Sequence, residues 1–137
     1  MPSDPIVETV EIRAAPEVVF RYFTEPGALT EWLGESADVE ARTGGRFTVR
    51  IRGETIRGRY VRIEPPRRLS ITWGREGSEL LPPGCSEVDV RFEAIDGGTL
   101  VTLEHRGLPT AEGPRHREGW RHFLGQLAAE LVDGQVS

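Results

Sequence analysis

The sequence predicts an α+β fold in which a curved antiparallel sheet of about six strands wraps around one long C-terminal α-helix. Three observations support this prediction. Apolar side chains recur at helical spacing from residue 113 to residue 133, whereas apolar and polar side chains alternate between residues 39 and 106. Two short helical segments follow the first strand. Because an antiparallel sheet buries one face, we expect the helices to cover that face.

The first elements are a strand and two short helices. Alternating side chains predict the strand at residues 6–13, although Glu8 interrupts its apolar side. Pro16, followed by an acidic residue, begins the first short helix, because both residue types are favourable in a first helical turn. The second short helix begins at Pro26 and ends at Gly34. The two helices form a bent unit rather than one rod.

Turn residues divide the middle of the chain into strands that pair as consecutive hairpins. The predicted turns are Gly44-Gly45, Gly53-Glu54 and Asp96-Gly97-Gly98. The strands begin with Val39 and continue at residues 47–51, 56–63, 69–73, 88–92 and 100–106. Consecutive hairpins of this kind predict an antiparallel meander.

The last predicted element is the helix from Gly113 to Asp133. Pro114 suits its first turn, and Gly134 suits the left-handed position after its end. One face of this helix carries the apolar residues Trp120, Phe123, Leu124, Leu127, Ala128, Leu131 and Val132.

Length and composition restrict the class of protein. A chain of 137 residues fits a single domain over residues 1–137, with an ordered core at about 5–134. A net charge of −5 argues against a nucleic-acid partner or an anionic membrane surface, because both would be repelled. No apolar run approaches the ~18 residues of a membrane span, and no leader sequence is visible. We therefore expect a cytoplasmic protein. Cys85 is the only cysteine, so no intrachain disulfide is possible.

Several motifs, taken in order, resemble the START-like or SRPBCC superfamily with its helix-grip fold. The first half of the pattern comprises Ile12-x-Ala14-x-Pro16-x-x-Val19-Phe20, Trp32 and Gly44-Gly45-x-Phe47. The second half comprises Gly58, Pro65-Pro66-Arg67-Arg68-Leu69, Thr72-Trp73, Gly98-Thr99, Leu103-Glu104-His105 and Gly119-Trp120. Within the superfamily the chain is most similar to the homologues of the activator of heat-shock-protein-90 ATPase (AHSA-like).

The resemblance implies an elongated cavity between the long helix and the concave sheet. Related proteins bind lipids, hormones or polyketides, cyclise aromatic substrates or act as co-chaperones, so the fold alone does not define the function. The resemblance does not imply a conserved set of catalytic residues. It covers one domain of the eukaryotic activators, whose separate N-terminal domain has no counterpart among these residues.

Aromatic and aliphatic side chains are the candidate lining of such a cavity, whose expected volume is ~300–1,000 Å³. The candidates are Trp32, Phe47, Tyr60, Trp73, Phe92, His105, Trp120, Phe123, Leu124 and Leu127. The alternative is that these side chains fill an ordinary hydrophobic core.

Three polar residues are candidate acids or bases: His105, Glu8 and Tyr60. His105 shares its strand face with apolar residues and could act as an acid, a base or a hydrogen-bond donor to a ligand. Its alternative role is structural, with a hydrogen bond to a backbone group or to Glu8. His116 and His122 are six residues apart, so they do not share a helix face as metal ligands would. We expect no metal and no cofactor.

Four arginines on two neighbouring strands form a possible basic patch: Arg50, Arg52, Arg57 and Arg59. The patch could contact an acidic partner, or one of its guanidinium groups could turn inward to hold a ligand carboxylate. Its alternative is a solvated sheet face with acidic neighbours.

The leading hypothesis is a domain that binds a small hydrophobic or aromatic molecule, rather than an enzyme. One alternative is an enzyme of the polyketide cyclase, dehydratase or hydrolase type that uses the same cavity. Another is a co-chaperone-like interaction module that binds a protein partner and stimulates a chaperone ATPase. The sequence is compatible with a monomer or a homodimer.

Overall fold

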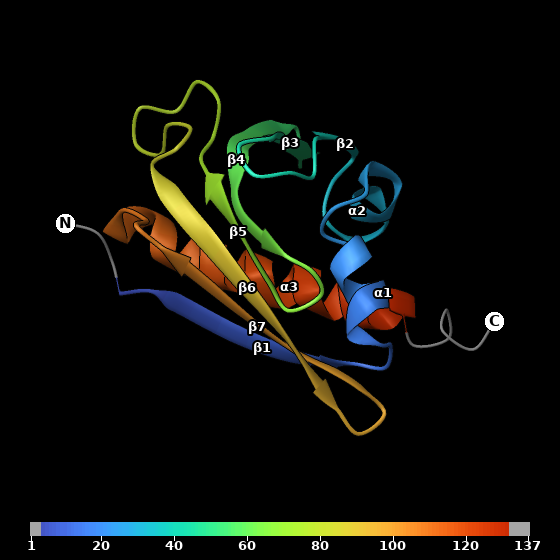
Figure 1. Ribbon diagram of the computed structural model, residues 1–137. Helices are drawn as coiled ribbons and strands as arrows, with labels where there is room; N and C mark the ends of the chain where they lie inside the picture. Colours follow the sequence, from blue (N-terminus) through green and yellow to red (C-terminus); the bar gives the residue numbers. More distant parts are fainter. Residues whose placement is uncertain (1–3, 132–137) are drawn as a thin grey trace.

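An antiparallel sheet of seven strands curves around one long helix in the computed structural model, which describes residues 4–131 (Figure 1). The strands are β1 Ile6–Ile12, β2 Ser36–Val39, β3 Arg46–Ile51, β4 Glu54–Glu64, β5 Arg68–Trp73, β6 Ser86–Ile95 and β7 Gly98–Arg106. The helices are α1 Pro16–Arg21, α2 Pro26–Trp32, the short 3₁₀ helix η1 Thr110–Glu112 and α3 Gly113–Leu131. The strand order is β1-β7-β6-β5-β4-β3-β2.

The predicted fold class is confirmed, with small differences at the boundaries. The sheet has seven strands, where about six were predicted, and the short strand β2 pairs with β3 at one edge. Val39 ends β2, whereas the sequence pattern predicted that it begins a strand. The turn between β3 and β4 is Arg52-Gly53 rather than Gly53-Glu54. The helix predictions for Val132, Asp133 and Gly134 lie outside the described residues.

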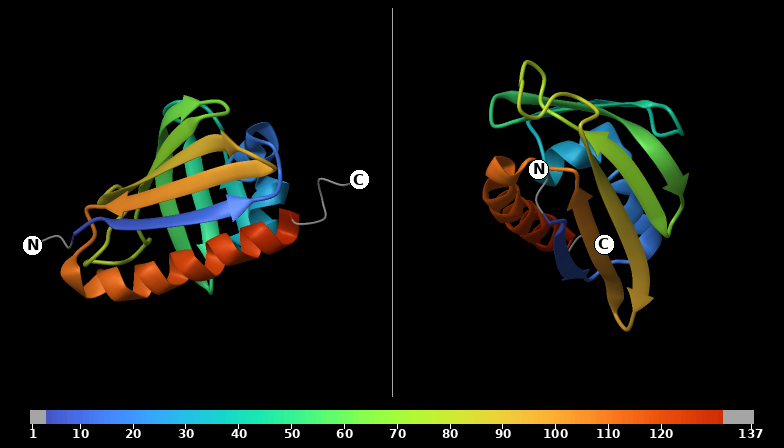
Figure 2. Two further views of the ribbon diagram at one scale, coloured as in Figure 1. Left: turned by 90° about the horizontal axis from the view of Figure 1, so that it is seen from below. Right: turned by 90° about the vertical axis from the view of Figure 1, so that its left-hand side faces the viewer.

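The curvature of the sheet has a visible cause in β4. A Cβ atom on Gly58 would lie 1.8 Å from the carbonyl oxygen of Thr72, so the two backbones approach in a way that only glycine permits. The register between β4 and β5 also shifts between Tyr60 and Arg62. Such irregularities bend a strand and increase its twist. Figure 2 shows the result: β3 and β4 cross above α3 while β1 runs along it.

The helices close the concave face of the sheet. Phe20 of α1, Phe23 of the turn after it and Trp32 of α2 are buried in the core. The ring centroids of Phe20 and Phe23 lie 5.1 Å and 5.2 Å from that of Phe92 on β6. The α3 side chains that are buried against the sheet are Trp120, Leu124, Leu127 and Leu131. No helix within residues 4–131 is long and apolar enough to cross a lipid bilayer.

Candidate ligand-binding site

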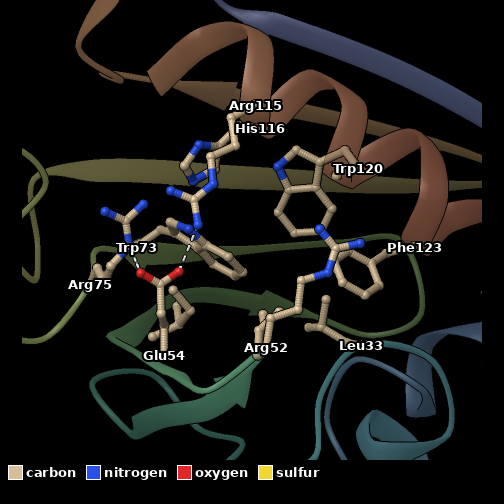
Figure 3. A pocket seen from close by; sticks show the side chains of 12 residues that line it. Leu33, Arg52, Glu54, Trp73, Arg75, Arg115, His116, Trp120 and Phe123 are labelled. Carbon is tan, nitrogen blue, oxygen red and sulfur yellow. Dashed lines mark hydrogen bonds and ion pairs between the residues drawn. The ribbon is translucent and has the colours of Figure 1, made fainter. Parts of the chain in front are cut away.

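A small pocket opens between the β3–β4 hairpin and the N-terminal half of α3 (Figure 3). Its volume is about 70 Å³. The lining residues are Leu33, Ile51, Arg52, Glu54, Ile56, Trp73, Arg75, Arg115, His116, Gly119, Trp120 and Phe123. The pocket thus has an apolar floor and a mouth that carries arginines.

Two tryptophans from opposite sides form most of the floor. Trp73 comes from β5 and Trp120 from α3, and their ring centroids are 5.1 Å apart. Phe123 lies one helical turn beyond Trp120, so it faces the same pocket. Both tryptophans are buried. The floor is therefore aromatic, pre-formed and held by the core.

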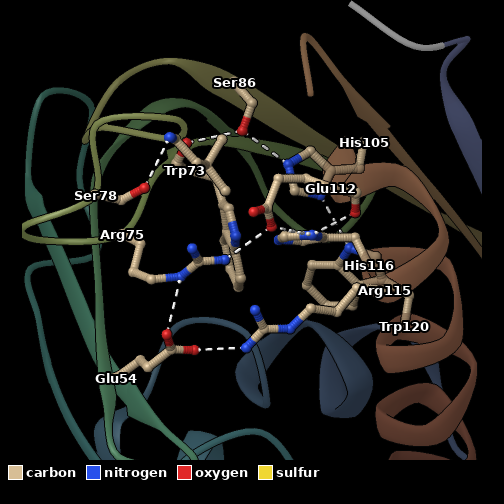
Figure 4. A network of polar contacts seen from close by, with 11 residues as sticks. Glu54, Trp73, Arg75, Ser78, Ser86, His105, Glu112, Arg115, His116 and Trp120 are labelled. Carbon is tan, nitrogen blue, oxygen red and sulfur yellow. Dashed lines mark hydrogen bonds and ion pairs between the residues drawn. The ribbon is translucent and has the colours of Figure 1, made fainter. Parts of the chain in front are cut away.

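Charged side chains surround the mouth in one connected network (Figure 4). Glu54 bridges two guanidinium groups, with Arg75 Nε at 3.3 Å and Arg115 Nη2 at 2.8 Å. Arg75 also donates to Glu112 Oε1 at 2.8 Å. Burial by itself would raise the pKa of Glu112, but the hydrogen bond and charge of Arg75 outweigh it and hold this pKa below its usual value.

His116 completes the network from the first turn of α3. Its Nδ1 lies 2.9 Å from the carbonyl oxygen of Glu112, so Nδ1 carries the proton and donates it. Burial lowers the pKa of His116, and this effect outweighs the neighbouring Glu112 carbonyl and carboxylate. His116 is therefore a neutral imidazole at neutral pH.

Arg52 covers the other side of the mouth. Its guanidinium lies 5.3 Å from the centroid of the Phe123 ring, a cation–π contact. The Arg52-Gly53 turn needs positive φ at both residues, and Arg52 adopts φ 51°. Arginine is an unusual choice for this conformation, for which asparagine and glycine are preferred.

The Trp73 indole carries an unused hydrogen-bond donor beside the pocket. Its Nε1 atom is buried and has no hydrogen-bond partner in the described part of the chain. Figures 3 and 4 both show the Trp73 ring beside Arg75, at the polar end of the pocket. An unpaired buried N–H is costly, so this atom is an attractive point for an acceptor.

A protein-family model matches most of the chain. Residues 13–132 match the family described as Activator of Hsp90 ATPase homolog 1-like protein. The chain belongs to this family. It is 26% identical over 110 residues to Activator of 90 kDa heat shock protein ATPase homolog 1 of Mus musculus. That match covers 80% of this chain but only 31% of the mouse protein, so the chain spans about a third of its curated relative.

Solved structures agree with this assignment. An AHSA1-like protein of Rhizobium etli is 38% identical, with a TM-score of 0.72 over 91% of this chain and 79% of that one. The Aha1 dimer of Colwellia psychrerythraea has a TM-score of 0.81 over 97% of this chain and 99% of that one. Its identity of 21% supports the fold alone.

The three candidate acids and bases do not meet in this AHSA1-like chain. Tyr60 is fully buried and donates from its hydroxyl to the Phe23 carbonyl oxygen at 2.9 Å. Burial raises its pKa far above the usual value. Glu8 faces α3 and pairs with Arg121 at 3.2 Å. None of the contacts described for Glu8 or Tyr60 involves His105 or the pocket.

His105 is fully satisfied by two side chains, neither of which the sequence analysis foresaw. Trp120 Nε1 donates to His105 Nδ1 at 3.0 Å, and His105 Nε2 lies 2.8 Å from Ser86 Oγ. Because Nδ1 accepts, Nε2 carries the proton and donates to Ser86, whose hydroxyl donates to the Trp73 carbonyl oxygen. Burial, followed by the nearby His116, lowers the pKa of His105 well below its usual value. Structurally, His105 joins β6, β7 and α3.

The ten predicted cavity residues are divided between the pocket and the core. Three of them line the pocket: Trp73, Trp120 and Phe123. A second, interior void of about 10 Å³ is lined by Trp32 and Phe47, together with Trp73 and Trp120. Tyr60, Phe92, His105, Leu124 and Leu127 line neither space. The open volume is below the expected range because the rings pack against one another.

Of the charged residues of the mouth, only Arg52 was a candidate from the sequence. Arg75 lies in a loop, Arg115 was assigned to the solvent face of the helix, and Glu54 was assigned to a turn. The one available signal was the Arg52-Gly53 dipeptide, because arginine replaces the usual Asn at a tight hairpin. The four arginines of the predicted patch do not share one face: Arg52 turns toward α3, away from the outer sheet face, in agreement with the alternative in which one guanidinium turns inward.

The remaining arginines of that patch lie on the outer face, where Arg50 and Arg57 have acidic partners and Arg59 has a backbone partner. Arg57 Nε donates to Glu76 at 2.8 Å, and Arg50 lies 3.6 Å from Glu35. Arg59 Nη1 donates to the Gly44 carbonyl oxygen. This face is therefore largely charge-balanced.

Proposed function

We propose that this protein binds a small apolar or aromatic molecule in the pocket between the β3–β4 hairpin and α3. The observation that carries the proposal is the floor of Trp73, Trp120 and Phe123, which is open at a charged mouth. An apolar pocket with a few convergent polar groups is the usual form of a small-molecule site. Membership of the AHSA1-like family is compatible with this function.

The size of the pocket limits how much of a ligand can lie inside it. A single water needs roughly 10–15 Å³, so about 70 Å³ admits roughly five to seven water-sized groups. This is enough for one ring or a short chain. The rest of a larger ligand would lie at the mouth, between Arg52 and Arg115.

The test begins with native mass spectrometry of the purified protein, followed by extraction and identification of any small molecule that remains bound. A stoichiometric aromatic or aliphatic compound supports the proposal. If the protein is bare, thermal shift is measured against fatty acids, sterols and aromatic polyketides. A bare protein that no compound stabilises would contradict it.

The helix offers a matched pair of variants for this test. A Cβ atom at Gly119 would meet no atom within 4 Å, and Gly119 lines the pocket. Gly119→Leu is therefore expected to fill the pocket and abolish binding while the fold remains stable. Gly125 is equally open but lies outside the pocket, so Gly125→Leu is expected to bind as the parent does. Both changes remove a helical glycine and improve helix propensity.

Interaction with a chaperone is a second candidate, supported by the similarity to the mouse protein named as an activator of a heat-shock-protein ATPase. The test is the ATPase rate of a purified Hsp90 with and without this protein. Stimulation that weakens with rising salt would support a charged contact surface. An unchanged rate together with no complex on gel filtration would contradict this candidate.

A further inference from the structure

We infer that the ligand of this pocket carries a carboxylate, and that Glu54 occupies the place of that carboxylate in the free protein. The inference rests on the proposed function and adds the ligand class: a small aromatic or aliphatic acid. Its tail would lie on Trp120 and Phe123, and its carboxylate would lie among the guanidinium groups of the mouth. Glu54 would then be an internal competitor.

The position of Glu54 is the first observation. Its two carboxylate oxygens contact different arginines, Arg75 at 3.3 Å and Arg115 at 2.8 Å, directly at the pocket. Figure 3 shows this carboxylate beside the aromatic floor. Two guanidinium groups that already hold one carboxylate can hold another in the same geometry.

The charge balance of the mouth is the second observation. Arg75 and Arg115 pair directly with two carboxylates, Glu54 and Glu112. Arg52 has no carboxylate within ion-pair distance among residues 4–131, although Glu118 lines an adjacent hollow together with Arg52 and Arg115. Arg52 is therefore a guanidinium at the mouth that no carboxylate of residues 4–131 pairs with directly, although the whole chain carries −5. A local positive region on an acidic protein favours a small anion.

The unpartnered donor is the third observation and is independent of the arginines. The Trp73 side chain is 4% exposed, and its Nε1–H has no acceptor within the described chain. A ligand oxygen at the polar end of the pocket would supply that acceptor. Glu54 does not supply it, because its contacts are with Arg75 and Arg115 and none involves Trp73 Nε1.

The exchange is feasible because Glu54 and its partner Arg115 are accessible to water. The Glu54 and Arg115 side chains are 39% and 61% exposed. Exposed ion pairs contribute little, so releasing Glu54 into solvent costs little. Arg75 is 14% exposed and stays anchored by Glu112, which keeps one guanidinium in place for the incoming carboxylate.

The experiment compares acids with their uncharged amides. The probes are phenylacetate against phenylacetamide, and 2-naphthylacetate against 2-naphthylacetamide, at pH 7.5, where the acids are ionised. Dissociation constants are measured by titration calorimetry and by quenching of tryptophan fluorescence, since Trp73 and Trp120 line the pocket. The acid is expected to bind about two- to fivefold more tightly than the amide.

Two variants at the mouth are expected to act in opposite directions. Glu54→Gln removes the internal competitor and should lower the dissociation constant of the acid by about two- to fivefold, with the dissociation constant of the amide unchanged. Arg115→Gln should weaken binding of the acid and leave binding of the amide unchanged. The controls make the same charge changes outside the pocket: Glu79→Gln on a loop and Arg117→Gln on α3, both at exposed positions. Circular dichroism and thermal melting verify that each variant is folded.

The results separate this inference from the proposed function. If the acid binds more tightly than the amide, and Glu54→Gln tightens the binding of the acid further, the carboxylate inference and the proposed function are both supported. Equal binding of acid and amide overturns the carboxylate inference and leaves the apolar site intact. Weaker acid binding in Glu54→Gln overturns the role of Glu54 as competitor. If neither member of any pair binds up to its solubility, the inference is overturned together with the binding of this class of ligand.

Discussion

Trp120 of α3 donates its indole N–H to Nδ1 of His105 on β7, over 3.0 Å in the fully buried core. This bond links the long helix to the sheet directly behind the candidate pocket. It also determines the tautomer of His105, because a tryptophan N–H can only donate. The floor of the pocket is therefore positioned by a polar contact as well as by aromatic packing.

Trp120→Phe is expected to destabilise the fold by about 1–3 kcal/mol, because it leaves the buried Nδ1 of His105 without a donor. The free energy of unfolding is measured with urea. A double-mutant cycle with His105→Leu isolates the pair, and we expect a coupling free energy of the order of 1 kcal/mol. Additive effects of the two changes would show that the bond contributes nothing specific.

Stability is expected to fall as the pH is lowered below about 6.5, the usual pKa of histidine. Burial holds the pKa of His105 well below this value in the folded state. Between the two pKa values the unfolded chain binds a proton that the folded chain does not, so acid favours unfolding.

The measurement is a series of urea titrations from pH 7.5 to pH 4.5. For one such histidine the loss approaches about 1.4 kcal/mol per pH unit within this window. His105→Gln is expected to flatten the profile relative to the parent, and the exposed His122→Gln is the matched control. Parallel profiles for parent and His105→Gln would refute the assignment.

Tyr60→Phe is expected to cost about 1–3 kcal/mol, because it leaves the buried Phe23 carbonyl oxygen without its donor. This bond connects β4 to the end of α1, across 37 residues of sequence. Tyr22→Phe is the control, since Tyr22 is only partly buried, and it should change stability by less than about 0.5 kcal/mol. Equal losses in the two variants would contradict the structural role of the Tyr60 hydroxyl.

Arg52→Asn separates backbone preference from ligand binding. Asparagine before Gly53 suits the two-residue turn better than arginine, whereas the lost contact with Phe123 costs about 0.5–1 kcal/mol at an exposed site. The two effects oppose each other, so the net change in unfolding free energy should stay within about 1 kcal/mol. Binding of 2-naphthylacetate should nevertheless weaken. A large loss of stability with unchanged binding would show that Arg52 serves the fold instead.

Much of the fold follows from local patterns that do not depend on distant residues. The i, i+3, i+4 spacing around Trp120 predicted α3, and the alternation in Val88, Val90 and Phe92 predicted β6. Errors were confined to boundaries such as Val39, where an edge strand of four residues leaves too short a pattern.

The sequence by itself determined which residues form the helix, the strands and the apolar faces, because these depend on propensity and spacing along the chain. Only the tertiary structure decided the partners of the polar groups. Glu54 and Arg115 are 61 residues apart, and Ser86 and His105 are 19 apart. Which of them meet depends on strand register and on the angle at which α3 crosses the sheet. Both are properties of the packed core, so the charged mouth and the buried histidine network became visible only in three dimensions.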